Sequence, residues 1–318
     1  MTVLRRPRSK QWLNVIAIFA ACIPLLAFAD SKNGFPLDDA LIPASEIKRG
    51  GPQKNGIPAL TSPIFVNADD ASFLTGRDRV LGLSHNGVNR AYPIRILNYH
   101  EIVNDVLGDD AVVITYCPLC GSGMAFSSSL RGERFIFGVS GLLYNSDVLM
   151  YDLQTQSLWS QLMSQAVSGP MKGDRLQALA VSHTSWEDWR NRYPETQVLS
   201  TQTGFNRNYR VDPYPNYARS GRIYFPVNQE SDLYKRKTIV MGLEIDGQFK
   251  VYPFDELKKA PRRFTDEFQG RTFDVLFDQD NKTARIVDDN DAEIPTTLAF
   301  WFAWYAFHPD SEVFSLEP

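Results

Sequence analysis

Two cysteines separated by two residues are the strongest candidates for chemistry in this sequence. They are Cys117 and Cys120, in the stretch VVITYCPLCGSGMAF that runs from residue 112 to 126. The β-branched and aromatic run before Cys117 is typical of a buried strand, and Gly121 can adopt the positive φ of a tight turn. The pair therefore predicts a knuckle that presents two thiolates at the end of a strand.

A metal ion bound there needs further ligands, because structural zinc sites take four and this sequence has no second pair of cysteines at such spacing. We expect His100, in NYHEIVND, to be the third ligand and Met124 or His183 to be a fourth. Thiolates with imidazole and thioether form a soft ligand set, which favours copper first and zinc second. Redox or metal-transfer chemistry would follow, and no nucleotide cofactor is expected.

Two alternatives remain open for the same cysteines. An oxidising compartment would allow a Cys117–Cys120 disulfide in a non-enzymatic binding or scaffold module. An active thiol-disulfide redox pair is the other alternative, although Gly121 and Gly123 are poor material for the helix that lowers a thiol pKa in thioredoxin-type motifs. The sequence does not decide whether the protein is an enzyme.

A second dense stretch, FGVSGLLYNSDVLMYDLQTQSLWSQ at 137–161, is rich in polar turns. One interpretation is a β-meander with ordinary Asx and Ser turns. The other is a polar wall beside the knuckle that binds substrate or orients metal ligands. Its candidate residues are Ser140, Asn145, Asp147, Asp152, Trp159 and Gln161.

The N-terminal residues indicate export. Residues 1–29 combine a basic start, an apolar run and an Ala-x-Ala pattern at Ala27 and Ala29, which predicts a signal peptide cleaved near Ala29. The protein would then be periplasmic or extracellular. A lipoprotein anchored at Cys22 and a retained anchor helix are the rival interpretations.

Composition excludes some classes of partner. The net charge is −4 and the basic residues are dispersed, which argues against nucleic acid. The last apolar stretch, LAFWFAWYAF at 298–307, is too short to cross a membrane and predicts a buried aromatic helix. No membrane span is expected in the mature chain, and a small molecule or a partner protein remains unspecified.

Two pairs of similar segments indicate an internal repeat. VLGLSHNGVNRAYPIRIL from Val80 matches VMGLEIDGQFKVYPFDEL from Val240, and WRNRYPETQVLS from Trp189 matches WYAFHPDSEVFS from Trp304. Asn-Gly and Asp-Gly between apolar runs predict hairpins, and the prolines after the aromatic segments predict helix ends. The spacing of the matches falls from 160 to 115 residues, so the first copy has insertions, one of which carries the cysteines.

The sequence thus predicts a β-rich α+β protein of two divergent copies of one hairpin-plus-helix module, the first with two insertions. The expected parts are a signal peptide at 1–29, an extended N-terminal segment at 30–62, a first module with the CPLC insertion at 63–200, a connection at 201–222 and a second module at 223–318.

Several of these strings, HEIVND, YCPLCGSGMAF, FGVSGLLYNSDVLMYD and SLWSQ, resemble the uncharacterised prokaryotic family DUF3179 over about residues 75 to 315. The resemblance implies no activity. It places eight residues inside recurring motifs of the family: His100, Cys117, Cys120, Asn145, Asp147, Asp152, Trp159 and Gln161. Where the family usually has Tyr-Asp-Arg, this chain has Tyr151-Asp152-Leu153.

Overall fold

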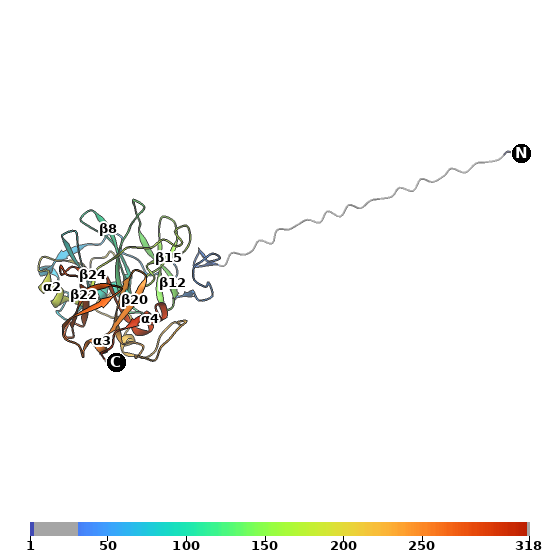
Figure 1. The fold of residues 1–318 in the computed structure, drawn as a ribbon. Helices are drawn as coiled ribbons and strands as arrows, with labels where there is room; N and C mark the ends of the chain where they lie inside the picture. The colour runs from blue at the N-terminus through green and yellow to red at the C-terminus, as the bar shows by residue number, and fades with distance from the viewer. Residues whose placement is uncertain (3–30, 317–318) are drawn as a thin grey trace.

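Two β-hairpins with the same turn chemistry organise the fold in the computed structural model, which describes residues 1–2 and 31–316 (Figure 1). Strand β5 (Arg79–His85) pairs with β6 (Val88–Pro93) across Asn86-Gly87, and β19 (Ile239–Ile245) pairs with β20 (Gln248–Pro253) across Asp246-Gly247. All four turn residues have positive φ, as a two-residue hairpin turn requires. The predicted signal peptide lies almost wholly outside the described residues.

A short helix starts directly after the proline that ends each hairpin. These are α1 (Ile94–His100) and α3 (Phe254–Leu257). Two further helices, α2 (Trp186–Arg192) and α4 (Trp301–Phe307), end one residue before Tyr193-Pro194 and His308-Pro309. Each end is set by the proline, which disfavours helical geometry in the residue before it.

The strand pairings around the two hairpins correspond. Strand β17 (Ser182–Ser185) pairs antiparallel with β5, and β18 (Gln197–Leu199) pairs parallel with β6. Strand β25 (Thr296–Phe300) pairs antiparallel with β19, and β26 (Glu312–Val313) pairs parallel with β20. Helix α2 connects β17 to β18, and α4 connects β25 to β26. The segments 63–200 and 223–318, termed the first and the second unit, therefore both end with a helix followed by a strand.

Four sheets carry most of the strands, and the protein is β-rich as expected. One of these sheets contains the first hairpin, and another packs on the second hairpin. The first has the order β17-β5-β6-β18-β4, with β4 at Phe65–Asn67. The other has the order β21-β22-β23-β24, formed by Arg263–Phe268, Arg271–Asp278, Thr283–Val287 and Glu293–Ile294.

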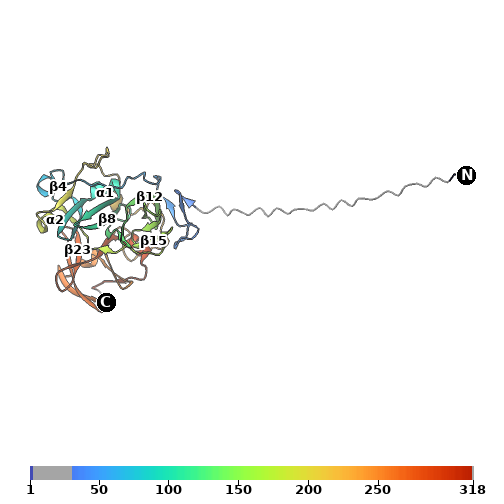
Figure 2. The ribbon, with the colours of Figure 1, turned by 90° about the horizontal axis from the view of Figure 1, so that it is seen from above.

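The cysteine strands join the two units in one eight-stranded sheet. Strands β7 (Ile102–Leu107), β8 (Asp110–Cys117) and β9 (Ser122–Ser127) extend the sheet of the second unit, because β9 pairs with β25. A short strand, β16 (Ala178–Leu179), also pairs with β9. In Figure 2 the blue-green first unit and the orange second unit lie on opposite sides, with β8 between them.

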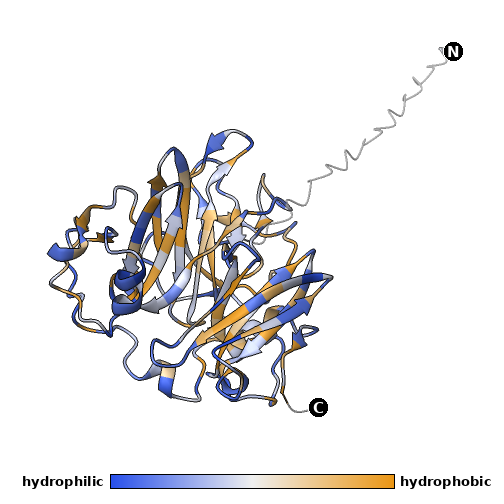
Figure 3. Cartoon of the chain, turned by 60° about the vertical axis from the view of Figure 1, so that its left-hand side comes forward, coloured by the Kyte–Doolittle hydropathy of each residue, from blue (hydrophilic) through white to orange (hydrophobic). Residues whose placement is uncertain are grey.

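The stretch 137–161 forms an antiparallel meander that packs over the cysteines. Its sheet has the order β15-β14-β13-β12-β3, formed by Gln165–Ser168, Leu158–Ser160, Asp147–Asp152, Phe137–Tyr144 and Lys48–Arg49. Short two-residue strands make two small hairpins, β1 (Ser31–Lys32) with β2 (Phe35–Pro36) and β10 (Ser129–Leu130) with β11 (Glu133–Arg134). Apolar residues are concentrated in the central strands, whereas the outer loops carry both polar and apolar residues (Figure 3).

The connection between the units is part of the body rather than a free linker. Within 201–238 it has one short 3-10 helix, Tyr217–Arg219, and Tyr217 is buried against the cluster that contains both cysteines. Among the described residues no helix is long and apolar enough to span a membrane. The stretch LAFWFAWYAF is divided, because its first three residues end β25 and the rest form the buried helix α4.

Candidate metal centre

The two cysteines lie in the turn between β8 and β9. Cys117 ends β8 and pairs with Ser122, and Cys120 stands inside the turn. Gly121 has a φ of +64°, the conformation that glycine adopts at least cost, as the knuckle requires. The Cys120 carbonyl accepts a hydrogen bond from the Phe300 amide at 2.8 Å. The knuckle is therefore held by the second unit as well as by its own strands.

Asp147 comes from a second turn and meets the knuckle. It follows Asn145 and Ser146, which form the β12–β13 turn with φ values of 49° and 68°. One Asp147 carboxylate oxygen and the two cysteine Sγ atoms all lie within 4.8 Å of one another. Tetrahedral zinc with Zn–S bonds of about 2.3 Å would hold two sulfurs about 3.8 Å apart. The three side chains could thus bind one metal ion with little movement.

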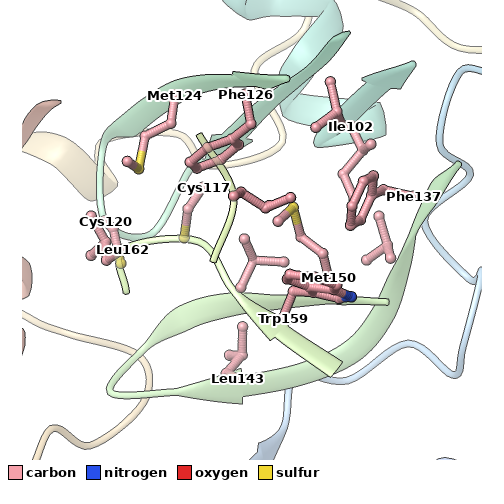
Figure 4. Close-up of a cluster of buried hydrophobic side chains, with 14 of the residues drawn as sticks. Ile102, Cys117, Cys120, Met124, Phe126, Phe137, Leu143, Met150, Trp159 and Leu162 are labelled. Atoms are coloured by element: carbon pink, nitrogen blue, oxygen red, sulfur yellow. The ribbon is translucent and has the colours of Figure 1, made fainter. Parts of the chain in front are cut away.

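The same turn also contacts both thiols through its backbone. The Ser146 carbonyl accepts a hydrogen bond from Cys120 Sγ at 3.4 Å and from Cys117 Sγ at 3.8 Å. The Leu162 amide donates to Asp147 Oδ2 at 3.1 Å and fixes the carboxyl group. Figure 4 shows the two sulfurs inside a cluster of buried side chains, with Leu162 beside Cys120.

Burial sets the acid-base properties of these groups. It raises the pKa of both thiols, most strongly that of Cys120, and it raises the pKa of Asp147 to about 7. Reactive redox cysteines have a lowered pKa and a partly exposed sulfur, which is the opposite arrangement. The two thiols are free and are not joined in a disulfide. Neither the disulfide nor the redox-pair alternative gains support here.

Three buried oxygen atoms at this place have no hydrogen-bond partner among the described residues. They are Ser146 Oγ, Asp147 Oδ1 and the hydroxyl oxygen of Tyr217. Buried polar atoms are nearly always paired, so a cluster of unpaired ones suggests a missing ligand. Lys237 lies over the ring of Tyr217. Its Nζ is 3.2 Å from the ring centroid and donates a hydrogen bond to the Tyr217 carbonyl at 3.0 Å. Burial lowers the pKa of Lys237 to about 8.

His100, the expected third ligand, is not part of this group. It is the last residue of α1, its Nδ1 is hydrogen-bonded to the Pro58 carbonyl at 2.7 Å, and its Nε2 to the Tyr209 hydroxyl at 2.6 Å. With both nitrogens engaged, the imidazole fastens the connection to α1. Asp147 stands beside the sulfurs instead, because the β12–β13 turn folds back over the knuckle.

The two candidates for a fourth ligand lie on different sides of β8 and β9. Met124, in β9, is buried in the same apolar cluster as the cysteines (Figure 4). His183, in β17, contacts the edge of the Tyr116 ring at a centroid distance of 6.0 Å, and its Nδ1 is buried with no hydrogen-bond partner in the part of the chain that the structure describes. His183 is not a member of the three-residue group.

Two of the polar residues predicted around the site shape the meander. The Ser140 hydroxyl donates to the Leu149 carbonyl and accepts from the Leu142 amide, across the irregular register of β12 and β13. Asn145 donates to the Ala306 carbonyl at 3.2 Å and accepts from the Asn228 amide at 2.9 Å. Asn145 thus ties the Asp147 turn to α4 and to the connection.

The other three are also engaged in hydrogen bonds within the fold. Asp152 accepts from the Trp159 indole at 2.9 Å and from the backbone of its own turn. Gln161 donates to Thr115 at 2.8 Å and accepts from Ser122 at 2.7 Å, and so bridges β8 and β9 beside the knuckle. The bonds of Asp152, Trp159 and Gln161 support the site from behind, since they hold the strands that carry its ligands.

Sequence reasoning did not single out Glu101, although it lies inside HEIVND. Its side chain is buried, and burial together with the charge of Asp147 raises its pKa to about 8. No hydrogen bond joins its carboxyl group to any described residue. The neighbouring His100 drew the prediction because histidine is the commoner ligand type, whereas a buried Glu is visible only once β7 and β8 are paired.

The comparisons with known proteins agree with the motif resemblance. A family model described as "Protein of unknown function (DUF3179)" matches residues 54–311, which is most of the chain and begins before the first hairpin. Neither the curated proteins nor the solved structures contain a significant match.

Proposed function

This chain belongs to the DUF3179 family, and we propose that it is a metalloprotein that holds one divalent metal ion between Cys117, Cys120 and Asp147. The observation that carries the proposal is the meeting of two turns distant in sequence, which buries two thiols and a carboxylate within 4.8 Å of one another. Acidic groups buried together are costly to ionise unless a cation compensates them.

The electrostatics around the three ligands favour a bound cation. Glu101, Tyr214 and Tyr217 surround them, and burial with the nearby acidic groups raises the pKa of each. A divalent cation would reverse this effect, because it stabilises the thiolates and the carboxylate directly. Lys237 then adds a further positive charge beside Cys120.

Zinc fits this ligand set better than copper. Copper was the first expectation, based on thiolates with imidazole and thioether, but the third group is a carboxylate. Cu(I) prefers soft sulfur and nitrogen ligands, while Zn²⁺ accepts thiolate and carboxylate oxygen together. We therefore place zinc first and make copper an outcome of the metal analysis.

Three protein ligands leave the fourth position of a tetrahedral ion free. Structural zinc sites are closed by four protein ligands, whereas catalytic sites keep one position for water or substrate. We infer that the centre is of the catalytic type, with the metal acting as a Lewis acid rather than as an electron carrier. Zinc has no redox chemistry of its own, so this proposal replaces redox chemistry with activation of a bound molecule.

We further propose that the protein is exported and that its two units arose by duplication. Export through residues 1–29 would place the protein in an oxidising compartment, where a bound metal protects neighbouring thiols from oxidation. The two hairpin-plus-helix units, 63–200 and 223–318, are divergent copies of one module. Their corresponding pairings at offsets of 160 and 115 residues support the duplication, with the cysteine turn in material that only the first copy has.

The test is metal analysis of the full chain purified without chelators, together with a thiol count in denaturant. We expect about one zinc per chain and loss of at least nine-tenths of it in Cys117→Ser, Cys120→Ser and Asp147→Asn. Asp147→Asn keeps an oxygen that can accept a hydrogen bond from the Leu162 amide, so this variant should still fold.

His100→Gln is the matched control, because it removes the histidine first expected to bind the metal. It should keep its zinc. Loss of zinc in His100→Gln with retention in Asp147→Asn would overturn the ligand assignment. A metal-free chain without titratable thiols would indicate the disulfide-containing scaffold instead, and stoichiometric copper would restore the soft-metal hypothesis.

A further inference from the structure

Glu101 has a strained backbone that the fold holds in place. It follows α1 with φ 57° and ψ −32°, a conformation that costs a non-glycine residue about 1 kcal/mol or more. Its amide donates to the Leu97 carbonyl at 2.7 Å, and its carbonyl accepts from the Tyr116 amide at 2.7 Å. The position is therefore fixed between the end of α1 and strand β8, directly before Ile102 begins β7.

Only 8% of Glu101 is exposed, yet its carboxyl group makes no hydrogen bond with any described residue, and its oxygens are not among the fully buried atoms that lack a partner. Buried carboxyl groups are normally paired or hydrogen-bonded, because an unpaired one is costly. The two backbone hydrogen bonds hold the residue in place, but its carboxyl group makes no such contact with another described residue. A group outside the protein is the remaining kind of partner.

Glu101 lines a cavity of about 280 Å³. The walls are mainly apolar and include Ile57, Leu119, Val139, Leu143, Val148 and Phe225. Two tyrosines, Tyr214 and Tyr224, also line it, together with Gly50, Pro52, Gly141 and Leu142. Small-molecule sites are typically apolar with a few polar groups that fix orientation, and this volume is just below the range of drug-sized ligands.

The cavity adjoins the metal centre on two sides. Leu119 lies between the two cysteines, and Val148 directly follows Asp147, so both turns that supply metal ligands also supply cavity wall. A molecule bound against Glu101 would therefore lie next to the centre. The remaining wall comes from residues in the ranges 50–57 and 139–143, and from Tyr214, Tyr224 and Phe225.

We propose that this cavity is a binding site for a small uncharged phenol or alcohol, whose hydroxyl group is hydrogen-bonded by Glu101. A hydroxyl both donates and accepts, so it can pair with a carboxyl group in either protonation state. Apolar walls disfavour a charged ligand, and the aromatic side chains suit a ring. We assign the cavity to the molecule on which the metal acts, and this assignment rests on the proposed function.

The experiment measures binding of phenol and of toluene, its apolar analogue, to the metal-loaded full chain by calorimetry or ligand-observed NMR. Phenol should bind more tightly than toluene. Glu101→Leu should weaken phenol binding at least tenfold and leave toluene binding unchanged or stronger, while Glu101→Gln keeps a hydrogen bond and should lose less. Glu133→Leu, the same substitution at an exposed glutamate, is the matched control and should change neither.

A second variant guards against an unfolded protein. Ile57→Trp fills the cavity from a partly buried wall position and should abolish binding of both compounds without lowering the zinc content. Equal phenol affinity in the wild type and Glu101→Leu, or no binding of either compound to the wild type, would overturn the proposal. Metal content separates the two proposals. Glu101-dependent phenol binding to a chain without metal would retain the cavity site and discard the metal centre.

Discussion

The Cys120 carbonyl and the Phe300 amide are joined by a 2.8 Å hydrogen bond between residues 180 positions apart. One lies in the cysteine turn of the first unit and the other ends β25 of the second. This bond places the metal-binding turn at the junction of the two units. The geometry of the centre therefore depends on how they pack, which neither unit fixes alone.

Gly121 should be intolerant of a side chain. A Cβ there would lie 3.0 Å from the Phe300 ring, and the residue has a φ of +64°. Gly121→Ala should destabilise the protein by about 1–3 kcal/mol and weaken zinc binding at least tenfold. Gly204→Ala is the control, because it has a φ of +80° with no atom near the added Cβ. Chemical denaturation and competition with a zinc chelator measure the two effects. Equal losses in both variants would show that only the backbone matters.

Zinc binding should release protons. Burial raises the pKa of both thiols, so at pH 8 they are protonated in the metal-free protein, and both must ionise to bind. At pH 8 we expect about two protons released per zinc. The affinity should fall about 100- to 200-fold between pH 8 and pH 7, because Asp147, with a pKa of about 7, becomes protonated over this range as well. Titration calorimetry in buffers of different ionisation enthalpy measures the number of protons released. A release near zero in the wild type would contradict a thiolate site.

Two glycines make room for the tryptophans that cover each hairpin. A Cβ on Gly82 would lie 2.1 Å from the Trp189 ring, and one on Gly242 would lie 1.9 Å from the Trp304 ring. Gly82→Ala and Gly242→Ala should each destabilise the protein by about 3 kcal/mol, because the ring is buried and cannot move aside. Gly221→Ala, with no atom near the added Cβ, should be close to neutral. Tolerance of alanine at only one of the pair would argue against equivalent packing in the two units.

His308 should make stability fall in mild acid. Its ring stacks on the Phe249 ring with the two ring centroids 3.8 Å apart, and burial lowers the pKa of His308 to about 4. Because the folded state favours the neutral ring, its contribution is complete above pH 6.5 and is lost as the pH falls from 6.5 to 4. The loss is at most about 3.5 kcal/mol, because the pKa is lowered by about 2.5 units at about 1.4 kcal/mol per unit.

Urea unfolding of the wild type and His308→Phe between pH 7 and pH 4 measures this contribution. As the pH falls, the unfolding free energy of the wild type should decrease more than that of His308→Phe. A difference that stays constant across this range would show that the buried imidazole does not contribute to the acid sensitivity.

Local sequence determined the hairpins, the helix ends and the knuckle. Asn86-Gly87 and Asp246-Gly247 form the turns that their φ preferences favour, and the prolines at 194 and 309 set the ends of α2 and α4. Cys117 ends a strand and Gly121 has positive φ, because these features depend on residues a few positions apart. Membership of the DUF3179 family was likewise readable from short motifs.

Only the tertiary structure decided which groups meet. Asp147 reaches the sulfurs from a turn some 30 residues away, and His100 turns to Pro58 and Tyr209 although it is closer to the knuckle in sequence. The pairing of β9 with β25, which joins the two units, has no local signal either. Backbone preferences act over a few residues, whereas a metal site is assembled by packing between distant segments. The sequence alone therefore indicated the sulfurs, and only the fold revealed the carboxylate beside them.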